Sequence, residues 1–293
     1  MTLSLQSTNG DLEFSTSQPN FWKLVAMPEG DTVWRAARHL DQALSGHPLI
    51  RTDFRVPEHA TLDLSGRVAG STIARGKHLL TRIGDDHTLH THLRMEGAWH
   101  LYKPGTRWRR PAHEARVVLE TVPWSAVGFA LGIVSVIPRG DEVAVVGHLG
   151  PDLLGPDWDP DEAVRRIREA PARPVADALL DQRNLAGIGN LYKSELCFLA
   201  GVHPWRPVAD VPSLDRMVRR AHLMLEANKE RVEQTTTGDT RRGRQTWVYG
   251  RDKQPCRRCG TTVRVAMQGP EGLERATYWC PACQPEASPR QNV

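Results

Sequence analysis

The sequence contains no long apolar run. No stretch approaches the ~18 consecutive apolar residues that a membrane-spanning helix requires. Residues 1–26 are rich in Ser, Thr, Gln and Asn, and they lack the basic start and apolar core of a secretion signal. These absences argue against a membrane protein and against a secreted one, so we expect a cytoplasmic protein with no membrane partner.

Cysteine is scarce, with only five among the 293 residues. A disulfide framework is improbable for so few cysteines in a cytoplasmic protein. Four of the five lie between Cys256 and Cys283, which favours a metal site. The fifth, Cys197, stands in an apolar helical stretch and is expected to be a small buried hydrophobic residue.

The net charge of +4 is mild but unevenly distributed. Residues 216–264 hold 13 Lys or Arg and only 5 Asp or Glu, so the remainder of the chain is net negative. Such asymmetry suggests that the C-terminal part faces a polyanion. A solvated basic face explains the same charge equally well, and charge alone leaves both interpretations open.

The first half of the chain has one helical pattern followed by β-type runs. Apolar residues recur at helical spacing through 31–44, where Asp31 or Thr32 can cap the start and Gly46 can end the helix. Short β-type runs follow, separated by turn residues such as those at 84–86. The runs are 50–56, 79–83, 88–93, 117–121 and 127–137. This pattern predicts a domain of strands with one leading helix.

The second half is helical and ends in a cysteine-rich segment. Residues 150–156, rich in Gly and Pro, interrupt the strand pattern and are typical of a linker. Helical spacing then appears in 161–170, 174–180, 191–199 and 213–233. A loop rich in Thr, Gly and Arg follows at 235–244, and residues 247–251 suggest a strand. The sequence therefore predicts an α+β multidomain protein.

Two Cys-x2-Cys pairs form the strongest local signal. Cys256 and Cys259 are separated by 20 residues from Cys280 and Cys283. Each pair places two thiolates on one side of a tight turn, and a hairpin between the pairs brings all four to tetrahedral Zn–S distances of ~2.3 Å. A redox pair is the weaker alternative. Four thiolates leave no open coordination position, so we expect one structural Zn²⁺.

Three further stretches carry a family resemblance. They are Met27-Pro28-Glu29-Gly30, then Leu180-Asp181-Gln182-Arg183-Asn184-Leu185-Ala186-Gly187-Ile188-Gly189-Asn190, and finally Arg275-Ala276-Thr277-Tyr278-Trp279-Cys280-Pro281-Ala282-Cys283-Gln284. In this order and with the cysteine pairs, they resemble the formamidopyrimidine-DNA glycosylase / endonuclease VIII family over residues 27–284.

The resemblance implies an architecture and an activity. It implies an N-terminal β-sandwich with a leading helix at 27–149, a helix–two-turn–helix domain at 150–245 and a zinc-finger β-hairpin at 246–285. Residues 286–293 are a tail, and residues 1–26 are a leader or precede a mis-assigned start. The implied activity is that of a bifunctional DNA glycosylase/AP lyase of base excision repair, with damaged double-stranded or single-stranded DNA as partner. We expect a monomer associated with the nucleoid.

Pro28 and Glu29 are the expected centre of this chemistry. An amine nucleophile must be unprotonated, and an α-amino group with a pKa of about 7.7–8 meets this condition more often than a lysine at ~10.4. Proline forms a charged iminium that eases β-elimination, and the dipole of the helix near Asp31 disfavours the ammonium form. The alternative is a proline with helix-compatible φ. Glu29 is the expected general acid/base, or a first-turn acid that complements the helix dipole.

Three residues match phosphate-binding positions of the family. Lys77 lies at an expected strand start and would assist the elimination, whereas a lone strand lysine is usually just exposed. Asn190 follows Gly187-Ile188-Gly189 at a helix start, where an Asn is commonly an N-cap and backbone amides can bind an anion. Arg275 would grip phosphate from the finger and would be linked to the second, δ-elimination of strand cleavage, with a turn arginine as the alternative.

A base inside the duplex cannot be reached, so the nucleotide must be flipped out and the gap must be filled. Met95 falls on an expected turn and can act as an apolar wedge, although a Met after a β-run is more often core. Arg94 beside it would contact the orphaned base. His148 matches a position that bears a basic DNA contact in relatives.

Two departures from the family pattern bear on function. Asp31 and Thr32 stand where relatives often carry Pro-Glu, and 26 residues precede Met27 although an internal proline has no amine to offer. The segment 234–245 is short for a loop that caps a bicyclic base, so oxidised pyrimidines are the expected substrates. The alternatives are a non-catalytic zinc-ribbon DNA-binding protein and an RNA-binding or ribosome-associated zinc-ribbon protein, neither of which needs a free Pro28.

Overall fold

The computed structural model describes residues 12–13 and 28–286, so the expected leader lies outside the described residues except for two positions. The chain divides into two compact units, which are treated separately below. The strand-rich unit contains residues 33–74 and 78–146, and the helical unit contains residues 28–32, 75–77 and the chain from 147 onward. No helix in the described ranges is long and apolar enough to cross a membrane.

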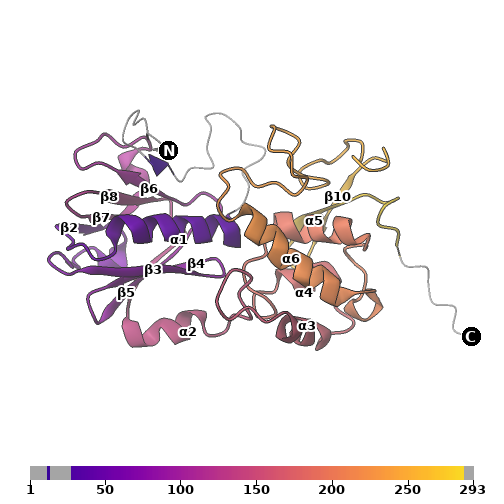
Figure 1. Cartoon of the computed structure of the whole chain (residues 1–293), viewed down its shortest axis with the longest axis horizontal. Coiled ribbons are helices and arrows are strands. Elements are labelled where there is room, and N and C mark those ends of the chain that lie inside the picture. The colour runs from indigo at the N-terminus through magenta and orange to yellow at the C-terminus, as the bar shows by residue number, and fades with distance from the viewer. Residues whose placement is uncertain (1–11, 14–27, 287–293) are drawn as a thin grey trace, which may run out of the picture. The chain divides into compact units, whose positions relative to one another are not determined.

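Helix α1 (Gly30–Leu44) confirms the leading helix predicted from apolar spacing (Figure 1). Its residues in the strand-rich unit bury one face, including Val33, Leu40 and Leu44. Gly46 follows with a φ of 79°, a left-handed conformation that favours glycine and ends the helix.

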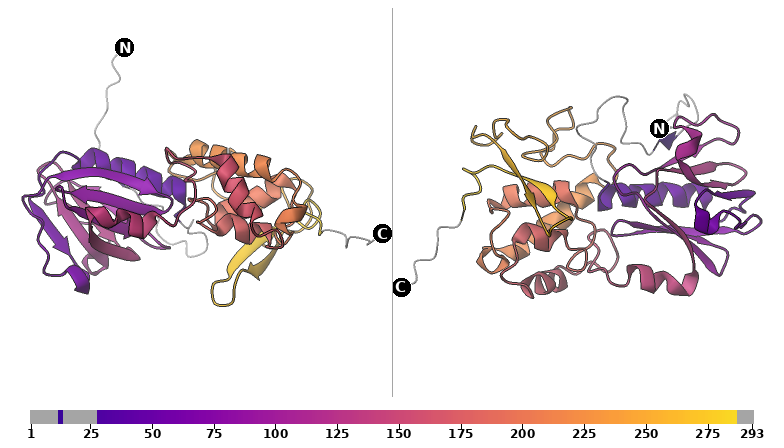
Figure 2. Two further views of the ribbon diagram at one scale, coloured as in Figure 1. Left: turned by 90° about the horizontal axis from the view of Figure 1, so that it is seen from below. Right: turned by 180° about the vertical axis from the view of Figure 1, so that it is seen from behind.

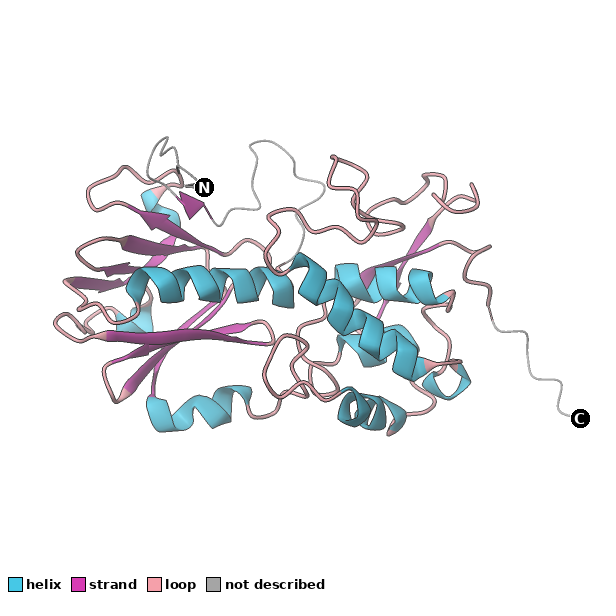
Figure 3. Ribbon diagram, in the orientation of Figure 1, coloured by secondary structure: helices cyan, strands magenta, loops and turns pink. Residues whose placement is uncertain are grey.

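The strand-rich unit is a sandwich of two sheets (Figure 3). One sheet has the order β1-β6-β8-β7-β2 and the other the order β3-β4-β5-β9. The strands of the first are β1 (Leu12–Glu13), β6 (Ala98–Tyr102), β8 (Ser125–Phe129), β7 (Ala115–Glu120) and β2 (Arg51–Phe54). Those of the second are β3 (Ala69–Arg75), β4 (His78–Ile83), β5 (His87–His92) and β9 (Ile133–Pro138).

A shared core joins the two sheets and α1. Buried apolar residues from both sheets form one cluster, and the indole of Trp99 on β6 donates a hydrogen bond to Thr91 on β5 at 3.3 Å. Short helices η1 (Pro57–His59), η2 (Ala112–Glu114), η3 (Arg139–Asp141) and α2 (Glu142–Val146) connect or cover the strands. Two sheets that share one buried apolar cluster confirm the predicted sandwich.

Three sequence predictions for this unit need correction. Strands β3 and β6 had no recognised pattern, because β3 mixes small and polar residues and β6 is short. The expected continuous run at 127–137 is two strands, β8 and β9, which belong to different sheets. Ala130 between them has a φ of 46°, and its amide bonds the Glu114 carbonyl at 2.8 Å. The residues between the two strands, 130–132, are Ala, Leu and Gly and include no polar side chain, so the hydrophobic pattern did not reveal the break.

The helical unit contains α3 (Pro160–Arg168), α4 (Val175–Leu180), α5 (Asn190–Ala200), η4 (Val208–Asp210) and α6 (Leu214–Asn228). These confirm four predicted helices around one apolar core. The expected helix 213–233 ends earlier, at Asn228. The Asn228 amide nitrogen donates to the Thr235 carbonyl at 2.9 Å and its amide oxygen accepts from the Thr235 amide at 2.8 Å, which turns the chain back.

The expected linker at 150–156 is anchored, not free. Asp152 is 4% exposed and forms a β-bridge with Ala186, and Gly150 donates to the Gln182 carbonyl at 2.8 Å. Gly and Pro content therefore indicated a break in regular structure correctly, but these residues pack within the helical unit.

The cysteine-rich end forms a hairpin of β10 (Arg264–Gln268) and β11 (Arg275–Trp279), which Figure 2 shows projecting from the helical unit. The expected strand at 247–251 is absent. Instead, the amides of Trp247, Val248 and Tyr249 all donate to the buried carboxylate of Glu195 at 2.8 Å. A single carboxylate takes the hydrogen bonds that a neighbouring strand would otherwise provide.

Candidate active site

The carboxylate of Glu29 caps the first turn of α5. One oxygen accepts from the Leu191 amide at 2.7 Å, and the other accepts from Gly189 at 2.7 Å and from Tyr192 at 3.4 Å. These amides have no partner within the helix, and the positive end of the helix dipole favours an anion at this place. Glu29 is fully buried and follows directly after Pro28, which is also buried.

Three glycines allow the chain around Glu29 to approach α5 this closely. A Cβ on Gly189 would lie 2.6 Å from the carboxyl carbon of Glu29. A Cβ on Gly30 would lie 2.9 Å from the Cα of Gly187, and the Gly30 amide donates to the Gly187 carbonyl at 2.8 Å. The glycines that carried the family resemblance therefore have a steric role at the Glu29 carboxylate.

The sequence analysis considered Asn190 as the N-cap and expected the backbone amides at this helix start to bind an external anion. Gly189 is the N-cap residue of α5 and Asn190 makes no side-chain cap. The Asn190 amide nitrogen donates instead to the Ala276 carbonyl on β11 at 2.7 Å. The anion that accepts from the α5 amides is Glu29, because the Gly30–Gly187 contact brings its carboxylate there.

Asp31 forms a second buried carboxylate in the same unit. The Tyr192 hydroxyl donates to it at 2.6 Å, and the side-chain amide of Gln234 donates to its two oxygens at 2.7 and 2.9 Å. Sequence analysis noted Asp31 only as a departure from the family pattern. Its partners Tyr192 and Gln234 were missed, because they are 161 and 203 positions away in the chain.

Lys77 lies in a two-residue turn between β3 and β4, one position before the strand start at which it was expected. Gly76 before it has a φ of 58° and donates its amide to the buried Asp152 carboxylate at 2.7 Å. Arg75 pairs with Asp157 and donates to the Gly150 carbonyl at 3.1 Å. Asp152, which the sequence analysis did not single out, therefore positions the Lys77 turn.

Glu29, Lys77 and Arg275 interact electrostatically. Burial raises the pKa of Glu29 to about 7, and the positive charge of Lys77 acts in the opposite direction, to lower this pKa. Asp31 adds to this rise, and the amides of Gly189 and Leu191 act against it. Burial also lowers the pKa of Lys77, and the charge of Arg275 lowers it further, while the two carboxylates act to raise it. The site thus holds a carboxyl group that titrates near neutrality beside a partly buried amine.

Helix α5 connects this site to the finger hairpin. Lys193 is fully buried and donates from Nζ to the Thr277 hydroxyl on β11 at 2.6 Å, and burial lowers its pKa to about 8. With the Asn190 contact, this bond holds the start of β11 against α5. Arg275, the first residue of β11, is exposed. Cys197 on α5 is buried as predicted, and burial raises the pKa of its thiol to about 12.

The four finger cysteines form one cluster. The sulfur atoms of Cys256, Cys259, Cys280 and Cys283 lie within 4.8 Å of one another. Three of the S–S separations are 4.0, 3.5 and 3.4 Å. Tetrahedral coordination with Zn–S bonds of ~2.3 Å requires separations of about 3.8 Å. The donor set therefore fits a metal ion bound by four thiolates.

Arg94 and Met95 lie in the strand-rich unit, on a tight turn at residues 93–97. The Gly97 amide donates to the Leu93 carbonyl at 2.9 Å, and a Cβ on Gly97 would lie 2.3 Å from that oxygen. Arg94 has a φ of 55°, and its Cγ lies 2.0 Å from the place of a Cβ on Gly132. Met95 is 58% exposed. The turn is therefore rigidly built and presents an apolar side chain to solvent.

His148, the remaining residue of the expected DNA contacts, is exposed at the start of the continuous part of the helical unit.

Comparison with known proteins identifies the family. The sequence model of the formamidopyrimidine-DNA glycosylase N-terminal domain matches residues 27–129, and that of the formamidopyrimidine-DNA glycosylase H2TH domain matches residues 149–238. The chain belongs to this family. The resemblance drawn from the sequence is thereby confirmed.

Two relatives and one solved structure illustrate the similarity. A probable endonuclease 8 2 of Streptomyces coelicolor is 55% identical over 268 residues, which cover 90% of this chain and 96% of the relative. The DNA-(apurinic or apyrimidinic site) lyase Nei2 of Mycolicibacterium smegmatis is 51% identical over 88% of this chain and 99% of its own length. The Lactococcus lactis Fpg in complex with abasic-site DNA has a TM-score of 0.72 at 21% identity, covering 88% of this chain and 100% of that one.

Proposed function

We propose that this DNA glycosylase/AP lyase removes oxidised pyrimidines, with the nitrogen of Pro28 as nucleophile and Glu29 as general acid/base. The observation that carries the proposal is the Glu29 carboxyl, buried beside Pro28 on the amides of α5 with a pKa near 7. A group with this pKa both donates and accepts protons at neutral pH.

The nucleophilic step requires that Pro28 be the first residue of the active protein. Its secondary amine then attacks C1′ of the damaged nucleotide as the bond from C1′ to the base breaks and the base leaves with a proton. The proline nitrogen loses its proton, the C1′–O4′ bond breaks as O4′ is protonated, and an iminium then joins Pro28 to C1′ of the opened sugar. The iminium acidifies the C2′–H bond; a base then takes the C2′ proton, and the electron pair forms a C2′=C3′ double bond as the 3′ phosphate leaves. The family match begins at residue 27, which supports this start.

Lys77, Arg275 and Asn190 are proposed to bind the phosphates that flank the lesion. Lys77 is held by the Asp152-anchored turn, and Arg275 is exposed at the start of β11. Arg94, Met95 and His148 are proposed as further DNA contacts, with Met95 as the wedge that fills the gap left by the flipped nucleotide. Zn²⁺ is the proposed ion of the cysteine cluster, and its proposed contribution is to stabilise the hairpin that carries Arg275.

The preference for pyrimidines rests on the loop between α6 and the finger. The amides of Thr236 and Thr237 both donate to the Gln245 carbonyl, at 2.8 and 3.3 Å, and close this loop at its base. Gln234 is already bonded to Asp31. A short loop tied to itself leaves little chain to enclose a bicyclic base, which favours smaller and less strongly stacked rings.

Borohydride trapping tests the chemistry. The protein that begins at Pro28 should form a covalent adduct with abasic-site DNA, and Pro28→Gly should lower adduct formation strongly without loss of binding. Pro57→Gly, at an exposed proline of the strand-rich unit, is the matched control. A protein that retains residues 1–27, confirmed by intact mass, and still forms the adduct would exclude Pro28 as nucleophile. Complete absence of adduct with every form would favour a non-catalytic DNA-binding protein.

Substrate choice and Glu29 are tested separately. Duplexes with thymine glycol, 5-hydroxyuracil or 8-oxoguanine should be excised with a clear preference for the two pyrimidines. Glu29→Gln should impair base removal more than cleavage of a preformed abasic site, while the exposed Glu58→Gln should change neither. A preference for 8-oxoguanine opposite cytosine would contradict the pyrimidine assignment alone.

A further inference from the structure

A basic segment with one indole lies in the strand-rich unit, outside the site described above. The connection from β6 to β7 contains Lys103, Arg107, Arg109 and Arg110 and has no acidic residue between Lys103 and His113. We call residues 103–112 the basic loop. Lys103, Arg107 and Arg109 are exposed, and Trp108 and Arg110 are half-buried. This loop belongs to none of the motifs that carried the family resemblance.

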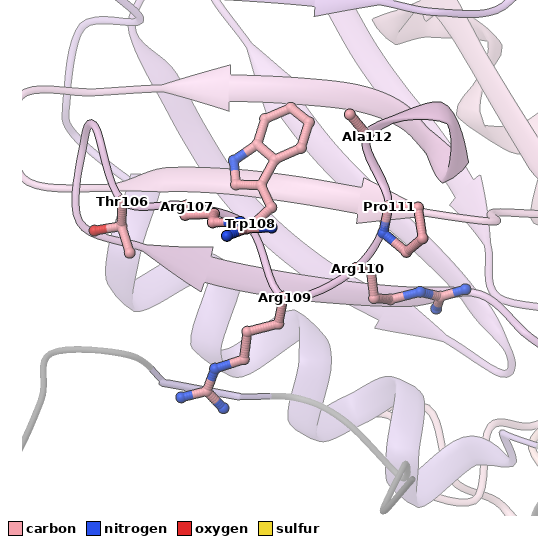
Figure 4. A pocket seen from close by; sticks show the side chains of 7 residues that line it. All are labelled: Thr106, Arg107, Trp108, Arg109, Arg110, Pro111 and Ala112. Atoms are coloured by element: carbon pink, nitrogen blue, oxygen red, sulfur yellow. The ribbon is translucent and has the colours of Figure 1, made fainter. Parts of the chain in front are cut away.

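The basic loop is built on a fixed aromatic centre. The guanidinium carbon of Arg55 lies 5.2 Å from the ring centre of Trp108, and the ring of Trp108 meets that of Phe129 edge-on at 5.7 Å. Residues 106–112 line an open cavity of about 590 Å³, from which Figure 4 shows Arg109 and Arg110 extending in different directions. The arginine side chains therefore start from an anchored backbone.

Arg110 connects the basic loop to the turn that carries Met95. It donates to the Glu96 carbonyl at 3.0 Å and to the Glu114 carboxylate at 2.7 Å. The backbone of the loop is also tied to the sheet, because the Arg109 amide donates to the Tyr102 hydroxyl at 3.2 Å. A polyanion that contacts Met95 is thus brought next to the basic loop within the same unit.

The arginine side chains of this region differ in whether they have an anionic partner. Arg55 pairs with Asp53 and Arg110 with Glu114, so both have a carboxylate partner. Arg107 makes no ion pair or hydrogen bond to any residue in the described part of the chain, and it is exposed. An anchored, exposed guanidinium without an anionic partner matches a phosphate oxygen in charge and hydrogen-bonding geometry.

We propose that the basic loop binds the phosphodiester backbone of DNA next to the Met95 turn, with Arg107 as its principal contact. The proposal rests on the proposed function insofar as it takes the partner to be the DNA substrate. The bound chemistry is the phosphate of the DNA backbone and not a base, because Trp108 is already packed between Arg55 and Phe129. The loop therefore adds affinity without sequence preference.

The expected effect is a change in the salt dependence of binding. Each phosphate neutralised on duplex DNA contributes about 0.9 to the slope of log affinity against log salt. Loss of one such contact should lower the slope by about 0.9, so the ratio of wild-type to variant affinity should fall by about 3.5-fold between 50 and 200 mM salt. A structural role of Arg107 would lower affinity at all salt concentrations without this dependence.

The experiment measures binding to a duplex with a tetrahydrofuran abasic-site analogue, using the full protein and a salt titration. Arg107→Ala should lower the slope, and Arg107→Lys should restore it. Arg139→Ala removes an exposed charge on η3 of the same unit and serves as control. Single methylphosphonate substitutions along the duplex should identify a phosphate whose neutralisation removes the difference between wild type and Arg107→Ala.

An unchanged slope for Arg107→Ala would overturn the proposal, and so would an equal decrease for Arg139→Ala, which would indicate only general attraction to the surface. Equal melting temperatures of the variants exclude a folding defect. Because this test measures binding, it is independent of borohydride trapping. A protein that binds with the predicted slopes but forms no adduct would contradict the proposed chemistry and would still support DNA binding by the basic loop.

Discussion

The Glu29 site and the Met95 turn place their side chains in opposite environments. In the helical unit, Glu29 and Asp31 are buried and each accepts several hydrogen bonds from fixed donors. In the strand-rich unit, Met95 and Arg107 are exposed on anchored backbone, and the side chains reach solvent. The difference matches the two proposed tasks: proton transfer by Glu29 would need a shifted pKa, which burial supplies, whereas contact with a large partner would need accessible side chains.

The largest effect is expected at the Glu29 site itself. Gly189→Ala places a Cβ within 2.6 Å of the Glu29 carboxyl carbon and must displace it from the amides of α5. We expect base excision to fall by about 10²–10⁴-fold, the usual contribution of a general acid/base. Single-turnover excision assays measure this loss. Gly140→Ala is the control, since nothing lies within 4 Å of a Cβ there, and normal activity of Gly189→Ala would contradict the role of the cap.

The buried carboxyl should also appear in the pH dependence of stability. The pKa of Glu29 is about 7 in the folded protein, above its ordinary value of 4.5, so the folded state binds more protons in this interval. The free energy of unfolding should therefore decrease as pH rises from 4.5 to 7, relative to Glu29→Gln, by up to about 3 kcal/mol. Urea unfolding of both proteins across this range measures it. A constant difference would show that the pKa of Glu29 is not raised.

The support of the Met95 turn gives a smaller effect. Gly132→Ala places a Cβ on the Arg94 side chain, which lies 2.0 Å away, and the turn must shift. We expect a loss of about 1–3 kcal/mol in the free energy of unfolding, the usual cost of overpacking. Excision from duplex DNA should decrease, with cleavage of a single-stranded abasic site unchanged. An unperturbed turn in a crystal structure of the variant, or an unchanged melting temperature, would show that Gly132 has no such role.

The smallest effect on stability is expected at Met95 itself. Met95→Ala removes an exposed side chain, so the melting temperature should hardly change, within about 0.5 kcal/mol. Excision from duplex DNA should still fall about tenfold, because the proposed wedge would offset part of the unstacking energy. Comparison with Met267→Ala, another exposed methionine in the helical unit, separates wedging from loss of apolar surface. Equal behaviour of the two variants would remove Met95 from the DNA contacts.

Local sequence patterns correctly predicted the elements that are determined by residues close to one another in the chain. The apolar spacing of α1, the cysteine pairs and the turn at Met95 all depend on neighbours in the chain, and the structure has them where the sequence placed them. The prediction of a strand at 247–251 was wrong because the structure of this segment is determined by a residue far away in the chain. Its backbone hydrogen bonds go to Glu195, which is more than 50 positions away, so the local apolar pattern contained no sign of them.

The sequence by itself determined the family, the residue types at the site and the four clustered thiols, because these depend on motifs and spacing. Only the tertiary structure decided what Glu29 does before substrate arrives. It brings residues 160 positions apart together through the Gly30–Gly187 contact, and this burial raises the Glu29 pKa. It also decided that Asn190 contacts the finger and that Asp152 holds the Lys77 turn. Desolvation and long-range hydrogen bonds arise from the packing of residues that are distant in the chain, so they cannot be predicted from local sequence patterns.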